Sequence, residues 1–184
     1  IIDTPGHVDF SYEVSRSMAA CEGAILLVDA TQGVEAQTLA NSWLAIEANL
    51  EIIPVLNKVD LPSADEEKIK EQIKNLIGID TKDAICVSAK TGQGIEPLID
   101  KIIKNIPSPN GKVELPLRAL LIDSWYDSYL GVMVLIRVVD GSISTGDKIS
   151  LILSGTEYQV DKVGTFTPKP IESKTLEAGE VGFI

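Results

Sequence analysis

The first part of the chain alternates between short apolar runs and amphipathic segments. Strands that are buried on both faces of a sheet have nearly continuous apolar runs of this kind. They cover residues 24–28, 52–56 and 84–87. Because strands alternate with helical patterns, we expect an α/β fold: a parallel sheet with helices on both faces.

Several helices are predicted around these strands. One covers residues 10–20, and in two others apolar residues recur every three or four positions, over 69–77 and 95–106. Ser63 followed by Glu66 predicts a capping box at the start of the helix that contains residues 69–77.

The pattern changes after a stretch rich in proline and glycine, residues 107–111. Beyond it the sequence predicts short strands separated by glycine-containing turns, which is typical of a small antiparallel β-barrel. These strands are expected at residues 117–123, 132–140, 148–153 and 157–163. The predicted domains are accordingly residues 1–106 and 115–184, joined by a linker at 107–114.

Two aromatic features are expected to be structural. The segment 124–129 holds Trp125, Tyr126 and Tyr129, which we expect in a loop that plugs the barrel, although exposed aromatics also mark interfaces. Trp43 is expected to pack in the core from a helix.

Charge and composition exclude several classes of protein. The formal net charge of −11 over 184 residues excludes binding to nucleic acid by a general cationic surface. No run of 18 apolar residues is present, so no membrane-spanning helix is expected. The two cysteines, Cys21 and Cys86, have no metal-like spacing, and we expect reduced core residues of a cytosolic protein.

The first motif that carries chemistry is Asp-Thr-Pro-Gly-His at residues 3–7, which we expect directly after a strand end. Asp3 is expected to hold Mg²⁺ through water. The amide of Gly6 is expected to approach a phosphate, and His7 to orient an attacking water. The alternative is a Pro-Gly turn with a surface histidine.

The second motif is Asn-Lys-Val-Asp at residues 57–60, after the strand at 52–56. Guanine presents two adjacent N–H donors, and the carboxylate of Asp60 can accept both, which adenine does not allow. Asn57 can bridge the loop and the base, while the aliphatic stem of Lys58 can lie over the base. The alternative is a solvated turn.

The third motif is Ser88-Ala89-Lys90, whose backbone N–H groups are expected to face O6 of guanine. All three motifs follow predicted strands. Because the carboxyl ends of parallel strands meet at one edge, they are expected to form a single site.

Together these motifs resemble the GTPase domain of translation factors that act on the ribosome. Residues 139–142, 146–149 and 178–182 resemble the β-barrel second domain of the same factors, and two longer stretches, from Asp3 and from Asp123, resemble the LepA (elongation factor 4) family. The resemblance implies a partial P-loop-GTPase-type sheet followed by a translation-factor second domain. Its cofactors would be GTP or GDP and Mg²⁺.

In that family, the residues that match His7 and Gly6 position the water and contact the γ-phosphate, and the match to Asp3 contacts Mg²⁺. Asn57, Lys58 and Asp60 would read the base, supported by Ser88, Ala89 and Lys90. The resemblance also implies a monomer that binds the ribosome, in the cytoplasm or peripherally on the inner face of the bacterial membrane.

One motif of the family, the phosphate loop G-x-x-x-x-G-K-[ST], does not occur in these 184 residues. Losing three charge-assisted hydrogen bonds lowers affinity by about three decades. We therefore expect the chain as given to be a segment of a longer GTPase and to be inactive alone. The alternatives are an elongation-factor-G-type GTPase and a non-hydrolysing guanine-nucleotide or ribosome-binding module.

Overall fold

The protein is described here by a computed structural model, which covers residues 1–4, 6–129 and 131–184. Two compact units make up the chain, Ile1–Pro107 and Ser108–Ile184. Residues 109–114, which fall in the expected linker, make contacts within the second unit.

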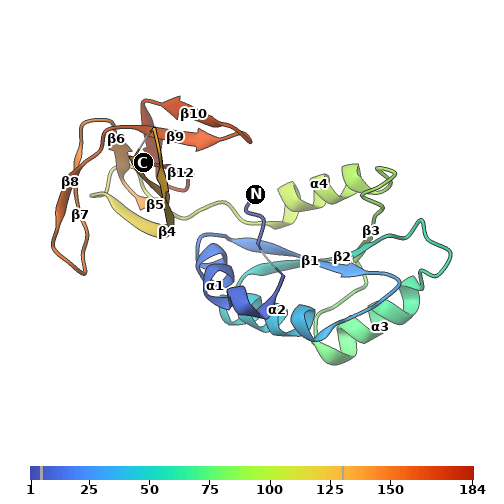
Figure 1. Ribbon diagram of the computed structural model, residues 1–184. Coiled ribbons are helices and arrows are strands. Elements are labelled where there is room, and N and C mark those ends of the chain that lie inside the picture. The colour runs from blue at the N-terminus through green and yellow to red at the C-terminus, as the bar shows by residue number, and fades with distance from the viewer. Residues whose placement is uncertain (5, 130) are drawn as a thin grey trace. The chain divides into compact units, whose positions relative to one another are not determined.

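The first unit is a parallel sheet covered by helices (Figure 1). The strand order is β1-β2-β3, and the end of β1, Asp29, is the register partner of the end of β2, Asn57. In chain order its elements are η1 (Val8–Phe10), α1 (Ser11–Ala19), β1 (Gly23–Asp29), α2 (Ala36–Glu47), β2 (Glu51–Asn57), α3 (Glu66–Leu76), β3 (Ile85–Cys86) and α4 (Ile95–Asn105).

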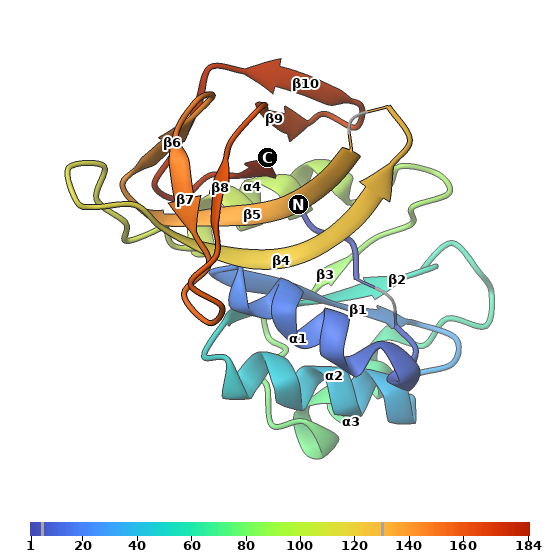
Figure 2. The same cartoon turned by 60° about the vertical axis from the view of Figure 1, so that its left-hand side comes forward.

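Helices lie on both faces of this sheet, as the sequence predicts. Figures 1 and 2 show α1, α2 and α3 on one side and α4 on the other. Neighbouring residues of β2 serve opposite faces, since Leu56 packs with Ile69 and Ile73 of α3, whereas Val55 packs with Ile102 of α4. The two buried faces fix the register of β2.

Strand β1 is an edge strand in the described part of the chain, paired only with β2. Its residues Ile25 and Leu27 lie on the α4 side of the sheet but are 39% and 56% exposed. Part of the apolar surface of β1 is therefore left exposed within this unit.

Two local expectations are wrong. Helix α3 is capped by Asp65, whose side chain accepts a hydrogen bond from the amide of Lys68, and not by Ser63. An aspartate is an equally good cap, and its negative charge also interacts favourably with the positive end of the helix dipole.

The strand expected to end at Asp3 is also absent, because residues 1–4 pair with no strand. An extended segment becomes a strand only when its backbone groups find a neighbouring strand. The predicted helix at residues 10–20 is present, as the short 3₁₀ turn η1 followed by α1.

The second unit consists of antiparallel strands around one core. A five-stranded sheet has the order β10-β9-β12-β5-β4, and two smaller ladders pair β11 with β6 and β7 with β8 (Figure 2). Its strands are β4 (Arg118–Asp127), β5 (Gly131–Asp140), β6 (Ser142–Ser144), β7 (Lys148–Ser150), β8 (Glu157–Gln159), β9 (Val163–Phe166), β10 (Pro170–Ser173), β11 (Thr175–Glu177) and β12 (Val181–Phe183).

Residues of β5, β6, β9 and β11 meet in this core, including Val138, Ile143, Val163 and Leu176. The expected antiparallel β unit is therefore present.

A buried carboxylate ties the start of this unit to β5. Asp140 accepts two hydrogen bonds from the guanidinium of Arg118, at 2.8 and 2.5 Å, and one from the amide of Lys112 at 3.1 Å. The Arg118 guanidinium holds the pKa of the Asp140 carboxyl below its usual range, with the Lys112 amide contributing next.

The expectations for the aromatic residues are largely wrong. Residues 124–127 belong to β4 and not to a loop, so successive side chains point to opposite faces. The ring of Trp125 packs against that of Phe166, with 6.0 Å between the ring centres. Tyr126 and Tyr129, in contrast, are 76% and 96% exposed. Trp43 on α2 is half exposed and does not lie in the core.

No helix in the described ranges combines the length and apolar character needed to cross a bilayer.

We expect Ile73→Ala and Ile103→Ala, which remove the same atoms from two helices, to differ sharply in stability. Ile73 is fully buried, so its truncation should lower the free energy of unfolding by about 2–5 kcal/mol. Ile103 is 75% exposed, and its truncation should change stability by less than about 0.5 kcal/mol. Urea unfolding followed by circular dichroism at the helix band reports on the first unit, where the described helices lie. Equal losses for the two variants would contradict the assigned core.

Candidate nucleotide-binding site

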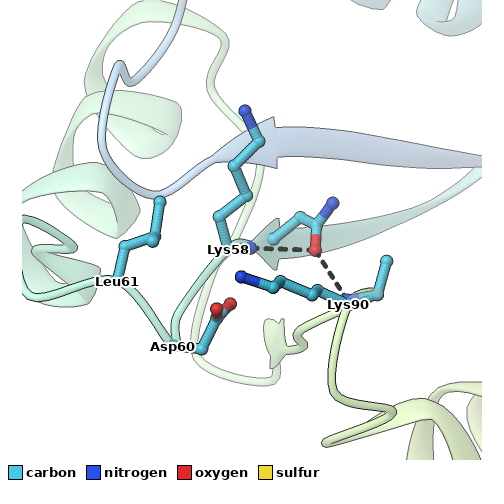
Figure 3. A pocket seen from close by; sticks show the side chains of 6 residues that line it. Lys58, Asp60, Leu61 and Lys90 are labelled. Atoms are coloured by element: carbon cyan, nitrogen blue, oxygen red, sulfur yellow. Dashed lines mark hydrogen bonds between the residues drawn. The ribbon is translucent and has the colours of Figure 1, made fainter.

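A hollow of about 260 Å³ lies at the carboxyl ends of β2 and β3 (Figure 3). The loops that follow these two strands form its walls. Its lining residues are Asn57, Lys58, Asp60, Leu61, Ala89 and Lys90. Five of these six residues come from the second and third sequence motifs, which the fold thus brings together.

Asn57 connects the two loops through one atom. Its Oδ1 accepts a hydrogen bond from the amide of Lys58 at 2.8 Å and another from the amide of Ala89 at 3.1 Å (Figure 3). The Asn57 carbonyl in turn accepts from the amide of Ala30, after β1. One asparagine therefore links three successive strand ends.

This arrangement affects the expected role of Ala89. Its amide already donates to Asn57, so it is engaged within the protein and not directed to a ligand. The Asn57 side-chain nitrogen, in contrast, has no acceptor among the residues that the structure describes, and is available as a donor.

Ser88 shapes the loop and does not line the hollow. It is completely buried, and its Oγ accepts a hydrogen bond from the amide of Thr91. The loop closes further through the Ser88 amide, which donates to Gln93. Gly94 completes the turn with φ near +75°, and a Cβ there would lie 2.2 Å from the carbonyl oxygen of Cys86.

Lys58 has an unusual backbone and a fixed side chain. Its φ of 65° lies in the left-handed region, which is uncommon for a residue other than glycine. Its Nζ lies 2.5 Å from Oδ2 of Asp29, and Figure 3 shows the side chain running toward β1.

Asp29 is itself held in place by Thr31. Its Oδ1 accepts from the Thr31 amide at 2.8 Å and from the Thr31 hydroxyl at 2.7 Å. The pKa of Asp29 is lowered well below its usual range, first by the hydrogen bond from Lys58 and then by those from Thr31. The carboxylate is thus charged over the whole neutral pH range.

Asp60 is the open acidic group of the hollow. It is exposed, and in the described part of the chain no donor lies within hydrogen-bonding distance of its carboxylate. Both oxygens are therefore open to a ligand with two adjacent donors. Lys90 extends across the hollow toward the loop that carries Asp60 (Figure 3).

The first motif lies apart from these contacts. Asp3, Gly6 and His7 are exposed and, over residues 1–4, 6–129 and 131–184, make no hydrogen bond or ion pair with residues lining the hollow. The carbonyl of Gly6 accepts from the side chain of Asn41 on α2 at 3.2 Å. Pro5, within the same motif, lies outside the described residues.

His7 is engaged on one side of its ring. Its Nδ1 accepts from the amide of Asp9 at 3.3 Å and lies 3.2 Å from the Asp9 carboxylate. The ring also packs edge-on against Phe10, 6.5 Å between centres. The nitrogen left for a water molecule is Nε2.

The chemistry of Asp3 is compatible with Mg²⁺ only together with a phosphate ligand. In the described ranges, no three His, Cys, Asp or Glu side chains gather as a metal site. Mg²⁺ nonetheless commonly takes one or two carboxylates and completes its octahedron with water and phosphate oxygens. Asp3 is therefore a ligand of the kind that such an ion needs beside a nucleotide.

Comparison with known sequences agrees with this geometry. Residues 1–108, which correspond closely to the first unit, match the family described as "Elongation factor Tu GTP binding domain". The chain belongs to this GTP-binding family. Over all 184 residues it is 58% identical to a protein named elongation factor 4 from Lactobacillus acidophilus.

The resemblance to the LepA family of translational GTPases is thereby confirmed. The chain spans about 30% of the length of this relative.

Two residues of the site carry no signal in the sequence motifs. Leu61 lines the hollow directly after Asp60, but a single leucine in a loop is not distinctive. Asp29 is 29 positions before Lys58 in the chain, and only the pairing of β1 with β2 brings the two side chains together.

We expect Asn57→Ala to release the amide of Ala89. Removing an acceptor worth about 1–1.5 kcal/mol should speed exchange of the Ala89 amide proton about tenfold, as measured by nuclear magnetic resonance. Asn57→Asp is the matched control, because it keeps an oxygen in the same position and should keep most of the protection. Unchanged exchange in the alanine variant would show that the link between the loops is not formed in solution.

Proposed function

We propose that the hollow between the β2 and β3 loops binds the base of a guanine nucleotide. The observation that carries the proposal is the convergence of Asn57, Lys58 and Asp60 with Ala89 and Lys90 on one hollow. Membership of a GTP-binding family supports the same conclusion.

In this proposal each residue has a distinct task. The Asp60 carboxylate accepts hydrogen bonds from N1–H and N2–H of guanine, a pair of donors that adenine lacks. The free side-chain nitrogen of Asn57 donates to an acceptor on the purine, while its Oδ1 keeps the two loops together. The aliphatic stem of Lys58 packs on the base.

We propose further that the full-length protein hydrolyses GTP as a translation factor on the ribosome. Bound Mg²⁺ would neutralise developing charge on the phosphates. Asp3 would hold that ion through water, the Gly6 amide would donate to the terminal phosphate, and His7 would orient the attacking water through Nε2. These roles rest on the family resemblance, and so does the cytoplasmic, monomeric and membrane-peripheral behaviour expected of LepA relatives.

Base selection by Asp60 is testable by changing its hydrogen-bonding type. In the full-length protein that carries this chain, Asp60→Asn should weaken binding of GTP about 100-fold and favour xanthosine triphosphate, whose base presents an acceptor where guanine presents a donor. Competition binding against both nucleotides measures the preference. Asp65→Asn, an exposed aspartate outside the hollow, is the control. Unaltered preference for GTP in the Asp60 variant would refute the proposed function.

The competing function, a guanine-binding module without turnover, makes a different prediction for His7. If the full-length protein is a GTPase, His7→Ala should slow hydrolysis at least about 100-fold, because positioned proton transfer and water orientation contribute this much. GDP affinity should stay within about twofold, since His7 does not line the hollow. Turnover measured with ribosomes present separates the functions. If the His7→Ala variant hydrolysed GTP at the wild-type rate, His7 would have no part in hydrolysis.

A further inference from the structure

We infer that Asp29 is a positioning residue for the guanine site, which holds Lys58 in the conformation that covers the base. The inference rests on the proposed function, since it concerns how the same hollow is kept ready. Asp29 lies at the end of β1 and is not among the residues that line the hollow.

The first observation is that Lys58 is held at both ends. Its amide donates to Asn57 Oδ1 at 2.8 Å, and its ammonium lies 2.5 Å from Asp29 Oδ2. The left-handed φ of 65° sets the direction in which the side chain leaves the loop. Between the two fixed ends, the methylene stem has little freedom to swing away from the hollow.

The second observation is that Asp29 is itself immobilised. Its side chain is only 17% exposed, and its other oxygen accepts both the amide and the hydroxyl of Thr31. An ion pair between two mobile surface side chains contributes little to order. Here one partner is anchored by the backbone of the turn after β1, so the pair can fix the other partner.

The third observation is that sheet pairing builds the tether. Asp29 and Asn57 are register partners in neighbouring parallel strands, and the Ala30 amide donates to the Asn57 carbonyl. The distance between Asp29 and the start of the Lys58 side chain is therefore set by the sheet and not by a flexible loop.

The consequence is preorganisation of the site. A free lysine loses much of its rotamer freedom when it packs against a ligand, and that loss opposes binding. If the side chain is already held in place, the nucleotide meets a formed surface. Losing the tether should weaken binding of the base, and should do so equally for GDP and GTP.

The test is a double-mutant cycle in the full-length protein that carries this chain, read as GDP affinity by calorimetry. Asp29→Asn and Lys58→Met should each weaken binding about tenfold, and the double variant should be no weaker than the Lys58 variant alone. Additive losses would overturn the inference, because Asp29 would then act on the site by another route. Wild-type affinity in Asp29→Asn would overturn it as well.

A matched control is available on α3. Glu67→Gln breaks a lysine–carboxylate pair with a 2.9 Å contact to Lys70, and neither residue of this pair lines the hollow. GDP affinity should be unchanged in this variant. An equal loss there would show that the effect of Asp29→Asn is a general consequence of removing negative charge, and would also overturn the inference.

A second comparison covers the case in which Asp29→Asn does not fold. Lys58→Met and Lys58→Arg both keep an unbranched stem and leave the Asp29–Thr31 contacts intact, but only arginine can pair with Asp29. The Lys58→Arg variant should bind guanosine several-fold more tightly than the Lys58→Met variant. Guanosine has no phosphate for the added cation to attract, so equal affinities would overturn the inference.

Asp60→Asn, measured in parallel, separates this inference from the proposed function. If that variant keeps its preference for GTP, the hollow is not a guanine site and both ideas fail. If the preference changes while the Asp29 and Lys58 variants bind GDP normally, only the positioning role of Asp29 is refuted.

Discussion

The candidate site depends on a single acceptor atom, Oδ1 of Asn57. It binds the amide of the next residue and the amide of Ala89, which lies 32 positions away in the loop after β3. Without this atom, the walls of the hollow would be two independent loops at adjacent strand ends. A shorter side chain could not reach both amides, and a purely apolar one would leave them without partners near the surface. The side chain also keeps its nitrogen for a ligand, so structural and recognition roles are divided between its two polar atoms.

The left-handed backbone conformation of Lys58, the next residue, depends on the same acceptor atom. A left-handed conformation is unfavourable by about 1–2 kcal/mol for a residue with a Cβ, and it persists where surrounding contacts determine it. At Lys58 these contacts are the hydrogen bond that its backbone N–H donates to Asn57 Oδ1 and the ion pair with Asp29. The conformation turns the side chain back toward β1 while the chain continues to Asp60 on the other side. A glycine would adopt this turn freely but would offer neither a stem for the base nor a charge for Asp29.

The sequence predicted those features of the fold and site that depend on local pattern. The runs in β1 and β2 and the amphipathic spacing of α3 and α4 were sufficient for the layered α/β unit, and residues 57–60 and 88–90 predicted the hollow. Features set by tertiary pairing were not accessible. Asp29 meets Lys58 only through the sheet. Asp65 and Ser63 are both residue types that cap helices, and the sequence alone did not identify which of them does so. The segment that contains Tyr126 has the composition of a loop, but β4 extends through it and leaves that side chain exposed.

The charge of the chain explains why recognition here must be local. With a net charge of −11, the chain's overall field repels a nucleotide and does not concentrate it near the surface. One of the two lysines that line the hollow, Lys58, is already neutralised by Asp29, which leaves Lys90 as the lining cation without a described carboxylate partner. Selectivity must then come from the directional hydrogen bonds of Asp60 and Asn57 and from the packed stem of Lys58. These short-range contacts act only when the loops are already in place. Asn57, which links the two loops, and Asp29, which holds Lys58, are the residues that keep them so.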